Sequence, residues 1–295
     1  MQLRGMVEKW PEPRTAEAMI ERVAAGTASQ PKRAKAVAVI PVSGALETRP
    51  TEMGAWLGMS SYEVIGKAFD YFMADETVSG IILDVSSPGG MVYGAQELAD
   101  KIYQARGTKP IVAVANPMAA SGAYWLATAA DRVVVTPSGD VGSVGVITEH
   151  VDLSKAYERD GVTVSTIKSA SSPYKGEFSS AEPLTDEARQ HLQSRVDAIS
   201  TQFIGDIARF RGVSASHVAE HFGKGRLVDS KAAMAAGMVD RIGTLQDIAV
   251  KMANGRIRIA GERAQDEWNA PTMQERLKER AEQILAAAET TGETA

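Results

Sequence analysis

Residues 79–90 read SGIILDVSSPGG, and their pattern indicates the type of fold. Its first half is a mostly apolar run, which is typical of a strand buried between two layers of helices. The proline and the two glycines at its end, Pro88, Gly89 and Gly90, are residues that turn the chain sharply. The stretch therefore predicts an inner strand that leads into a glycine-rich loop.

Similar short runs recur along the chain and alternate with helical patterns. Strands are expected at 36–44, 79–90, 110–116, 132–137, 144–148 and 162–169, and helices at 61–74, about 94–106 and from residue 121 onward. Short β-branched runs that alternate with helices imply βαβ units. The fold class is therefore α/β, with a mostly parallel sheet flanked by helices on both faces.

The chain divides into three parts by composition. Residues 1–35 are charged and predict a solvated N-terminal arm, residues 36–250 carry the alternating pattern of one domain, and residues 251–295 predict a C-terminal tail. Within the domain, apolar residues recur every three or four positions from Thr185 to Phe210, which predicts one long amphipathic helix. A second amphipathic helix is expected in the tail, from about residue 263.

The composition excludes several classes of protein. With 44% hydrophobic and 23% charged residues, the 295-residue chain has the balance of a soluble globular protein. A net charge of −5 gives no reason to expect a nucleic-acid partner. The absence of cysteine excludes disulfides, thiol catalysis and cysteine-bound metals. We expect neither a metal nor another cofactor.

One uncharged window, residues 110–130, is long enough to cross a bilayer. Asn116, Pro117, Ser121 and Gly122 interrupt it, so strand, turn and helix are the better interpretation. The charged N-terminus also lacks the apolar core of a secretion signal. We therefore expect a cytoplasmic protein without a membrane partner.

Ser121 is the one reactive side chain in the stretch MAASGAYW, residues 118–125. It falls between a buried strand and a helix, where free backbone N–H groups and the helix dipole stabilise negative charge. This position suits a nucleophile. It equally suits a simple helix N-cap, which is a common role of serine.

The loop SSPGG, residues 86–90, offers a second element of chemistry. Two adjacent glycines let consecutive backbone N–H groups point outward at one bound oxygen, as in an oxyanion hole. Open α/β folds place their sites at such strand ends. The alternative is an ordinary turn from a strand to a helix.

A nucleophilic serine needs a base, and the four histidines of the chain form no recognisable triad with it. A lysine can serve when its surroundings are dry enough to keep the amine neutral. Lys175 lies between Tyr174 and Phe178, which could exclude water, and Lys168 is the rival. The residues alone do not choose between these two lysines.

A zinc site is a further alternative. His217 and His221 stand four apart in the pattern HVAEH, in which two histidines on one helix face bind zinc. The pattern lies in a short polar segment, and a metal centre also needs a further acidic ligand. We therefore favour a surface helix.

The order of these motifs is more specific than any one of them. The loop SSPGG, the stretch MAASGAYW, then GDVGSVGVI, then IKSASSPYK and a long helix follow one another. This order resembles the signal peptide peptidase A family of Ser/Lys serine proteases, and especially its phage branch of head maturation proteases. The resemblance covers residues 37–250 and makes 36–250 the expected protease domain.

The resemblance implies a role for each matching residue. Ser121 would be the nucleophile, Gly89 and Gly90 with the Gly122 amide would form the oxyanion hole, Lys175 would be the general base, and Ser143 would orient the lysine amine. The connection IKSASSPYK is slightly longer than in the family, so Lys168 stays an alternative base. No cofactor or metal is implied.

The resemblance also implies a Clp protease and crotonase-like ββα spiral that assembles into a homo-oligomer, with sites near subunit interfaces. The substrate would be an extended peptide, and capsid scaffold proteins would be processed in the host cytoplasm or the phage procapsid. Bacterial members of the family carry a membrane anchor, which the charged N-terminus here does not predict. Three alternatives stay open: a peptide-degrading soluble relative, a crotonase-like acyl-CoA enzyme, and a non-catalytic shell component.

Overall fold

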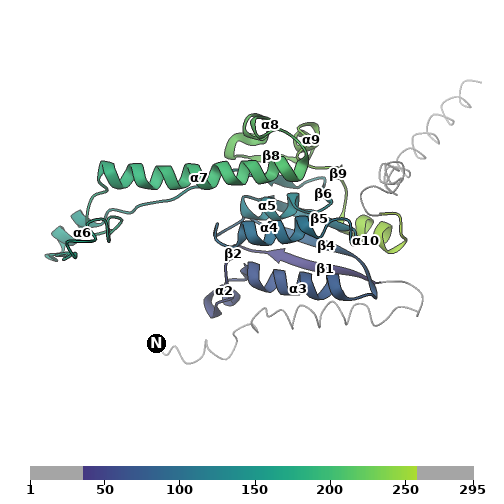
Figure 1. The fold of residues 1–295 in the computed structure, drawn as a ribbon, viewed down its shortest axis with the longest axis horizontal. Coiled ribbons are helices and arrows are strands. Elements are labelled where there is room, and N and C mark those ends of the chain that lie inside the picture. The colour runs from purple at the N-terminus through teal and green to yellow at the C-terminus, as the bar shows by residue number, and fades with distance from the viewer. Residues whose placement is uncertain (1–35, 258–295) are drawn as a thin grey trace, which may run out of the picture.

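The computed structural model describes residues 36–257 and centres on one sheet (Figure 1). Its main strands follow the spatial order β1 (Ala36–Ser43), β4 (Val78–Ser87), β5 (Ile111–Ala120), β6 (Arg132–Val135) and β9 (Arg241–Ile242). Every pairing along this order is parallel. The expected α/β fold with a mostly parallel sheet is therefore confirmed. The N-terminal arm expected at 1–35 and the helix expected from residue 263 lie outside the described residues.

Strand β5 changes partner halfway along its length. Residues 112–115 pair with β6, whereas residues 118–120 pair with β7 (Asp140–Gly142). Strand β7 in turn pairs antiparallel with β8 (Leu227–Asp229). The carboxyl half of β5 is thereby carried out of the main sheet and into a second layer, as expected for a ββα spiral. Two short strands, β2 (Leu46–Glu47) and β3 (Ser60–Ser61), form a separate parallel pair beside β1.

One face of the sheet carries the larger core. It is covered by α3 (Tyr62–Ala74), α4 (Ala95–Gln104), α5 (Gly122–Thr128) and the carboxyl half of α7 (Asp186–Arg211). Every residue of α5 is buried, because this short helix lies between the sheet and α7. The opposite face packs against α10 (Leu245–Ala253), whose Ile248 and Met252 are buried. The core therefore continues past residue 250.

Two predicted helices begin where their capping residues indicate. Ser61 accepts a hydrogen bond from the Val64 N–H at the start of α3, and Thr185 accepts one from the Ala188 N–H at the start of α7. Each cap satisfies a backbone N–H that has no partner inside its helix. Three shorter elements, α8 (Ala215–His221), a 3₁₀ turn (Gly223–Gly225) and α9 (Ser230–Ala235), follow α7.

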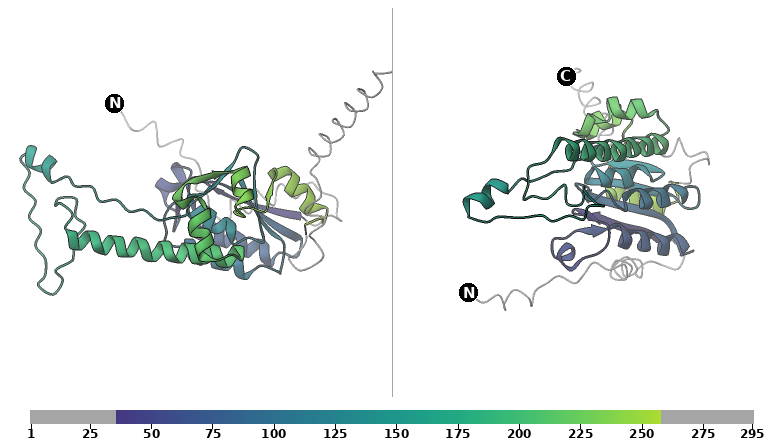
Figure 2. Two further views of the ribbon diagram at one scale, coloured as in Figure 1. Left: turned by 90° about the horizontal axis from the view of Figure 1, so that it is seen from above. Right: turned by 60° about the vertical axis from the view of Figure 1, so that its left-hand side comes forward.

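A long arm projects from this body (Figures 1 and 2). We use "the arm" for residues 146–200, which include two extended segments, the short helix α6 (Ser154–Arg159) and the first half of α7. Helix α7 joins the body through Phe203, which stacks on Trp125 of α5 at a ring separation of 4.4 Å. In both figures α6 lies at the far end of the arm.

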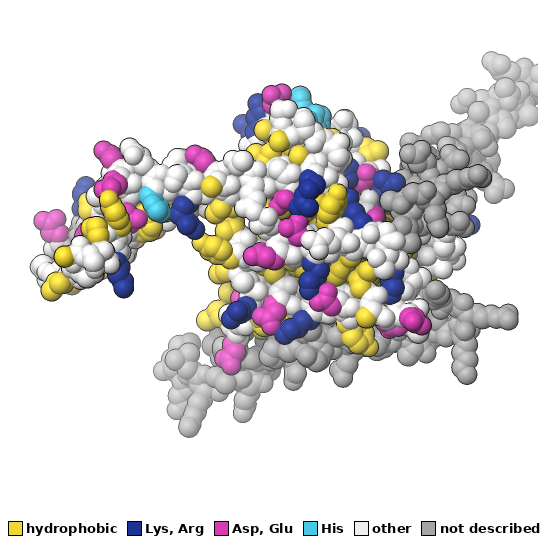
Figure 3. All heavy atoms as spheres, in the orientation of Figure 1, with side chains coloured by type: hydrophobic (Ala, Val, Ile, Leu, Met, Phe, Trp, Pro, Cys, Tyr) yellow, Lys and Arg dark blue, Asp and Glu magenta, His cyan; other side chains and the backbone are white. Residues whose placement is uncertain are grey.

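The strands predicted at 144–148 and 162–169 are absent from the described chain, so this part of the prediction is wrong for a single protomer. The segments are extended but unpaired. Val144 is buried, but Ile147 is 88% exposed and Ile167 is 95% exposed. Figure 3 likewise shows hydrophobic side chains on the surface of the arm. A strand needs a hydrogen-bonded neighbour as well as a suitable sequence. Within this chain neither segment has one.

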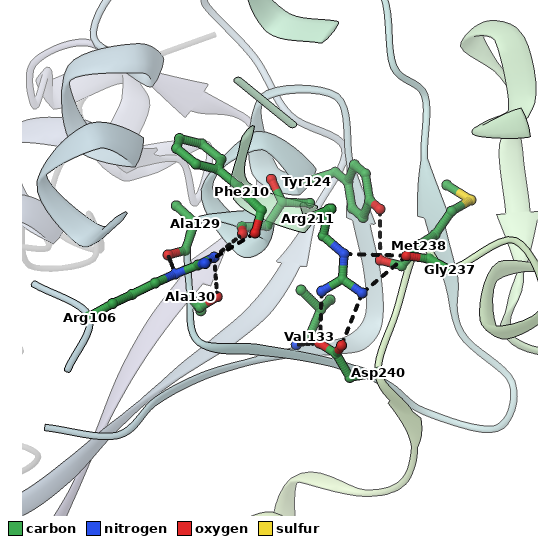
Figure 4. A network of polar contacts seen from close by, with 11 residues as sticks. Arg106, Tyr124, Ala129, Ala130, Val133, Phe210, Arg211, Gly237, Met238 and Asp240 are labelled. Atoms are coloured by element: carbon green, nitrogen blue, oxygen red, sulfur yellow. Dashed lines mark hydrogen bonds and ion pairs between the residues drawn. The ribbon is translucent and has the colours of Figure 1, made fainter. Parts of the chain in front are cut away.

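Two arginines fasten α5 and α7 to the body (Figure 4). The Arg106 guanidinium donates hydrogen bonds to the carbonyls of Thr128, Ala129 and Ala130 at the end of α5, and to that of Phe210 in α7. Arg211 pairs with Asp240 at 2.8 and 3.0 Å. The carbonyls that a short helix leaves unpaired are thereby satisfied, which fixes α5 in place.

No helix in the described range 36–257 is both long and apolar enough to span a bilayer.

Candidate active site

Ser121 lies at the turn between β5 and α5, with backbone angles φ 51° and ψ −127°. Positive φ is unfavourable for a residue with a side chain, and holding a residue in such a region costs about 1–3 kcal/mol. The turn resembles the sharp strand-to-helix elbow that exposes a nucleophile at the end of a sheet. Ser121 is only partly buried, so its hydroxyl is accessible.

The simple N-cap interpretation does not fit the Ser121 hydroxyl. The serines and threonines at the starts of α3, α7 and α8 accept a hydrogen bond from a backbone N–H of the first helical turn. Ser121 occupies the equivalent position at α5, but its side chain makes no such bond. The hydroxyl is therefore available for chemistry.

The glycine-rich loop after β4 lies directly against this turn. Gly89 has φ 92°, and a Cβ atom on it would lie 2.7 Å from the Ser121 Cβ. A side chain at position 89 would be excluded by both its backbone conformation and this contact. The predicted oxyanion loop and the predicted nucleophile therefore lie side by side.

The direction of the Gly90 N–H follows from its neighbours. The Gly89 carbonyl accepts a hydrogen bond from the Leu46 N–H at 2.8 Å. In a trans peptide the C=O and N–H point in opposite directions, so the Gly90 N–H points away from β2. Gly90 must also lack a side chain, because a Cβ would lie 2.1 Å from the Leu46 carbonyl oxygen.

The Gly122 N–H is fixed in the same way. The Ser121 carbonyl accepts hydrogen bonds from the N–H groups of Tyr124 and Trp125, at 2.9 and 3.0 Å. The Gly122 N–H on the other side of that peptide therefore points out of the helix. It faces the loop, since a Cβ on Gly89 would lie 2.9 Å from the Gly122 nitrogen.

The Gly89 N–H, which the sequence suggested as an oxyanion donor, has a hydrogen-bond partner in this structure. It donates to the Ser87 hydroxyl at 3.1 Å inside the protein. The same hydroxyl donates to the Gly44 carbonyl at 2.7 Å. The two N–H groups available beside Ser121 are therefore those of Gly90 and Gly122. Gly89 lies between them, and because it has no side chain the loop can approach Ser121 closely.

Ser143 lies beside Ser121. Strands β5 and β7 pair with Ala120 opposite Gly142, and the Ser121 N–H donates to the Gly142 carbonyl at 2.8 Å. Ser143 follows at the end of β7 and has φ 51°, held by a bond from its N–H to the Arg226 carbonyl at 2.9 Å. Like Ser121, it is partly buried.

The lysines are not brought to this site within one protomer. Lys175 is exposed and lies in the arm, next to the start of α7, where Tyr174 bonds to Glu187. The start of α7 lies about 25 Å along the helix axis from Phe203, at 1.5 Å per residue. Lys168 is also in the arm and partly buried. Lys175 and Ser121 of the same chain are therefore far apart.

The two histidines of HVAEH lie together on one short helix. His217 and His221 lie on α8 with their rings 4.8 Å apart, and His217 also contacts the Ala236 carbonyl through Nε2 at 3.2 Å. Among residues 36–257 no group of three or more histidine, aspartate or glutamate side chains is placed to hold a metal ion. This arrangement favours the surface-helix interpretation of HVAEH.

Sequence reasoning missed the residues that frame the site. Leu46 and Tyr62 come from elsewhere in the chain and contact the loop through backbone or hydroxyl groups. Burial raises the pKa of the Tyr62 hydroxyl, so the group stays protonated and donates to the Met91 carbonyl at 2.7 Å. Such contacts depend on the tertiary fold, and no local pattern signals them.

Comparison with known proteins gives a consistent result. Residues 104–257 match the model of Peptidase family S49. The capsid assembly protease C of Escherichia phage lambda is 32% identical over 267 residues, 87% of this chain and 60% of the relative. The head-tail preconnector protein GP5 of Enterobacteria phage P21 is 34% identical over 217 residues, 74% of this chain and 42% of the relative.

A bacterial relative has a similar level of identity. The putative signal peptide peptidase SppA of Enterococcus faecium is 31% identical over 174 residues, 59% of this chain and 50% of the relative. The chain therefore spans 60% or less of the length of each of these three relatives. The matched range 104–257 includes Ser121, Ser143 and both lysines, whereas the SSPGG loop precedes it.

Proposed function

Because the chain belongs to peptidase family S49, we propose that it is a serine-type endopeptidase with Ser121 as nucleophile and a lysine as general base. The observation that carries this proposal is the pairing of a strained serine turn with two converging backbone N–H groups, from Gly90 and Gly122. A free hydroxyl beside two such donors is the arrangement that acyl transfer requires.

The reaction follows from this geometry. The Ser121 Oγ attacks the carbonyl carbon of the scissile peptide bond while its proton passes to the neutral lysine amine. The carbonyl oxygen becomes an oxyanion and accepts hydrogen bonds from the Gly90 and Gly122 N–H groups. The lysine then gives its proton to the leaving amine, and an acyl-enzyme remains.

Water completes the cycle. The lysine amine takes a proton from the attacking water, the same two N–H groups hold the second oxyanion, and the returning proton regenerates the Ser121 hydroxyl. Loss of one oxyanion donor typically lowers kcat by about 10²–10³-fold. Because both donors are backbone groups held by their own carbonyls, they need no rearrangement during the reaction.

We assign the base to Lys175 of a neighbouring copy of the chain. The arm that carries Lys175 projects from the body, and its extended segments leave backbone and apolar side chains unpaired in one protomer. Pairing with a second copy would give the unpaired backbone groups hydrogen-bond partners and would also remove water from around the lysine amine. Ser143, beside Ser121, would then accept a hydrogen bond from the amine.

The substrate we propose is an extended segment of a phage head protein. The two phage relatives are named as a capsid assembly protease and a head-tail preconnector protein. An extended polypeptide would bind by main-chain hydrogen bonds near the carboxyl ends of β4 and β5. The names of these two relatives favour scaffold protein as the substrate class. Cleavage would take place inside a procapsid, or in the host cytoplasm before assembly.

The test begins with cleavage of an unfolded reporter polypeptide, with the products identified by mass spectrometry. Ser121→Ala should abolish cleavage while the thermal midpoint stays within a few degrees or rises, because the variant removes one unbonded hydroxyl. The matched control is Ser216→Ala, which removes an exposed hydroxyl on α8, outside the arm, and should retain activity. Full activity in Ser121→Ala would refute the proposal.

Mixing two inactive variants tests the shared site. Ser121→Ala keeps the lysine and Lys175→Ala keeps the serine, so random mixed oligomers should contain intact pairs at about one quarter of their sites. We expect partial recovery of activity after the two variants are unfolded and refolded together. If activity stays at zero, serine and lysine come from the same chain or Lys175 is not the base, and Lys168→Ala in the same assay separates these cases.

A further inference from the structure

Tyr62 is a buried tyrosine that has no role in the reaction steps proposed above. It is the first residue of α3, and its side chain is fixed because β3 and the Ser61 cap immediately precede it. Only 3% of Tyr62 is exposed. Its hydroxyl donates a hydrogen bond to the Met91 carbonyl at 2.7 Å. Met91 directly follows Gly90, so the tyrosine holds the loop that carries one oxyanion donor.

The same hydroxyl also borders the second donor. A Cβ atom on Gly122 would lie 2.8 Å from the Tyr62 Oη. The ring reaches the start of α4 as well, since a Cβ on Gly94 would lie 3.0 Å from its Cδ2. Tyr62 therefore fills the space between the glycine-rich loop, the start of α5 and the start of α4.

Tyr62 cannot itself donate to the oxyanion while this bond is intact. A phenol has one proton, and here the Met91 carbonyl accepts it. The backbone of Met91 is thereby fixed on both sides, because its N–H also donates to the Leu46 carbonyl at 2.9 Å. The tyrosine consequently acts through the backbone of the loop.

We propose that Tyr62 is a positioning residue that sets the spacing between the Gly90 and Gly122 N–H groups. This inference rests on the proposed serine peptidase function. The two donors belong to different segments, one after β4 and one after β5. The Tyr62 hydroxyl bonds to the Met91 carbonyl in the first segment and lies beside Gly122 in the second. Because oxyanion stabilisation depends on donor positions to a fraction of an ångström, loss of this hydroxyl should affect the transition state more than substrate binding.

Tyr62→Phe removes the hydroxyl and keeps the ring. We expect kcat to fall about tenfold with KM unchanged within twofold, because the donors serve only the tetrahedral states. Binding of a peptide aldehyde, which forms a tetrahedral adduct with the nucleophilic serine, should weaken by a similar factor. A purely structural role for Tyr62 would not produce this separation of kcat from KM.

Tyr124→Phe is the matched control. Tyr124 is also buried, and its hydroxyl also donates to a backbone carbonyl, that of Met238 at 2.8 Å, away from the glycine-rich loop. The control should lose comparable thermal stability but keep kcat within twofold. Equal losses of kcat in the two variants, or unchanged kcat in Tyr62→Phe, would overturn the inference.

A double variant gives a second test, which depends on the close approach of the Tyr62 hydroxyl to Gly122. Gly122→Ala places a methyl group against the Tyr62 Oη and should strongly reduce kcat. Removing that oxygen makes room, so Gly122→Ala/Tyr62→Phe should be more active than Gly122→Ala alone. An additive or larger loss in the double variant would contradict the proposed contact. Ser121→Ala in the same assay tests the peptidase function separately from the role of Tyr62.

Discussion

Ser121 and Ser143 follow paired residues at the ends of two neighbouring parallel strands, and both have a φ of 51°. One backbone bond, from the Ser121 N–H to the Gly142 carbonyl, sets this arrangement. Two serines with the same unfavourable backbone angle at one sheet edge indicate that the fold holds both hydroxyls in set positions. The rest of the site is built around this pair.

Ser143→Ala should lower activity by about tenfold to a hundredfold without abolishing it, because the proposed lysine would lose an orienting acceptor and not its chemistry. The pH–rate profile should shift toward acidic pH, because the lost hydroxyl oxygen, as an acceptor, would stabilise the charged ammonium more than the neutral amine. Ser216→Ala, on the exposed surface of α8 and outside the arm, should leave the profile unchanged. A profile that is identical in wild type and Ser143→Ala would argue against contact between Ser143 and the lysine.

Gly90→Ala should eliminate activity, and it should destabilise the protein. The new Cβ would lie 2.1 Å from the Leu46 carbonyl oxygen, so the loop must move and take the Gly90 N–H with it. Gly205→Ala is the contrasting change: Gly205 lies within α7 with no atom near the added Cβ, and alanine is favoured in helices by about 1 kcal/mol. Thermal melts and cleavage assays of both variants check this, and an active Gly90→Ala would exclude Gly90 as a donor.

Sequence reasoning succeeded where local pattern and tertiary burial agree. Strand β4 was predicted from its apolar run and helix α7 from apolar periodicity, and the repeating residues in the carboxyl half of α7, Phe203, Ile207 and Phe210, pack on the core. Ser121 and the SSPGG loop were each predicted at the end of a strand, and both lie at the same edge of the sheet because β4 and β5 pair in parallel. The hydrogen bond from the Gly89 N–H to the Ser87 hydroxyl was not predictable, because it forms only in the folded loop.

The arm shows the opposite case. The runs at 144–148 and 162–169 have the composition of strands, yet strand pairing is a property of two segments, and one protomer provides no partner for them. For the same reason, the sequence identified lysines of a suitable type but not the distance from Lys175 to a serine. The sequence of a segment shows that it can form a strand. It does not show which strand it pairs with when that strand belongs to another copy of the chain.

Asp84 links stability to pH. Burial raises the pKa of its carboxyl, although the hydrogen bond from the Asn116 amide at 3.1 Å opposes this shift. In the window just above the unfolded-state pKa, near 4, the folded protein therefore retains a proton that the unfolded chain releases. Stability decreases as the pH rises through that window, and the loss persists at neutral pH.

Asp84→Asn removes the charge and should raise the thermal midpoint at pH 7 by roughly 2 °C. The gain should vanish near pH 3, where Asp84 is protonated in both states. Glu76→Gln, at an exposed carboxylate in the turn before β4, should change the midpoint little at either pH. Differential scanning calorimetry at the two pH values checks this, and an equal gain at both would show that the effect is not electrostatic.

Ile167→Asp should weaken the proposed assembly and reduce activity in parallel. Ile167 is 95% exposed in a single protomer, in an extended segment beside Lys168, so a charge there should not disturb the folding of the body. If the arm pairs with a second copy, the new carboxylate would be buried without a partner, which is strongly unfavourable.

Sedimentation velocity across a range of protein concentrations measures this effect. We expect wild type to form oligomers and Ile167→Asp to shift toward the monomer, with residual cleavage following the remaining oligomer. Thr108→Asp, at an exposed turn before β5, adds the same charge away from the arm and should leave assembly unchanged. Because the proposed lysine comes from a neighbouring copy, a fully active monomer of Ile167→Asp would contradict both the arm contact and the shared site.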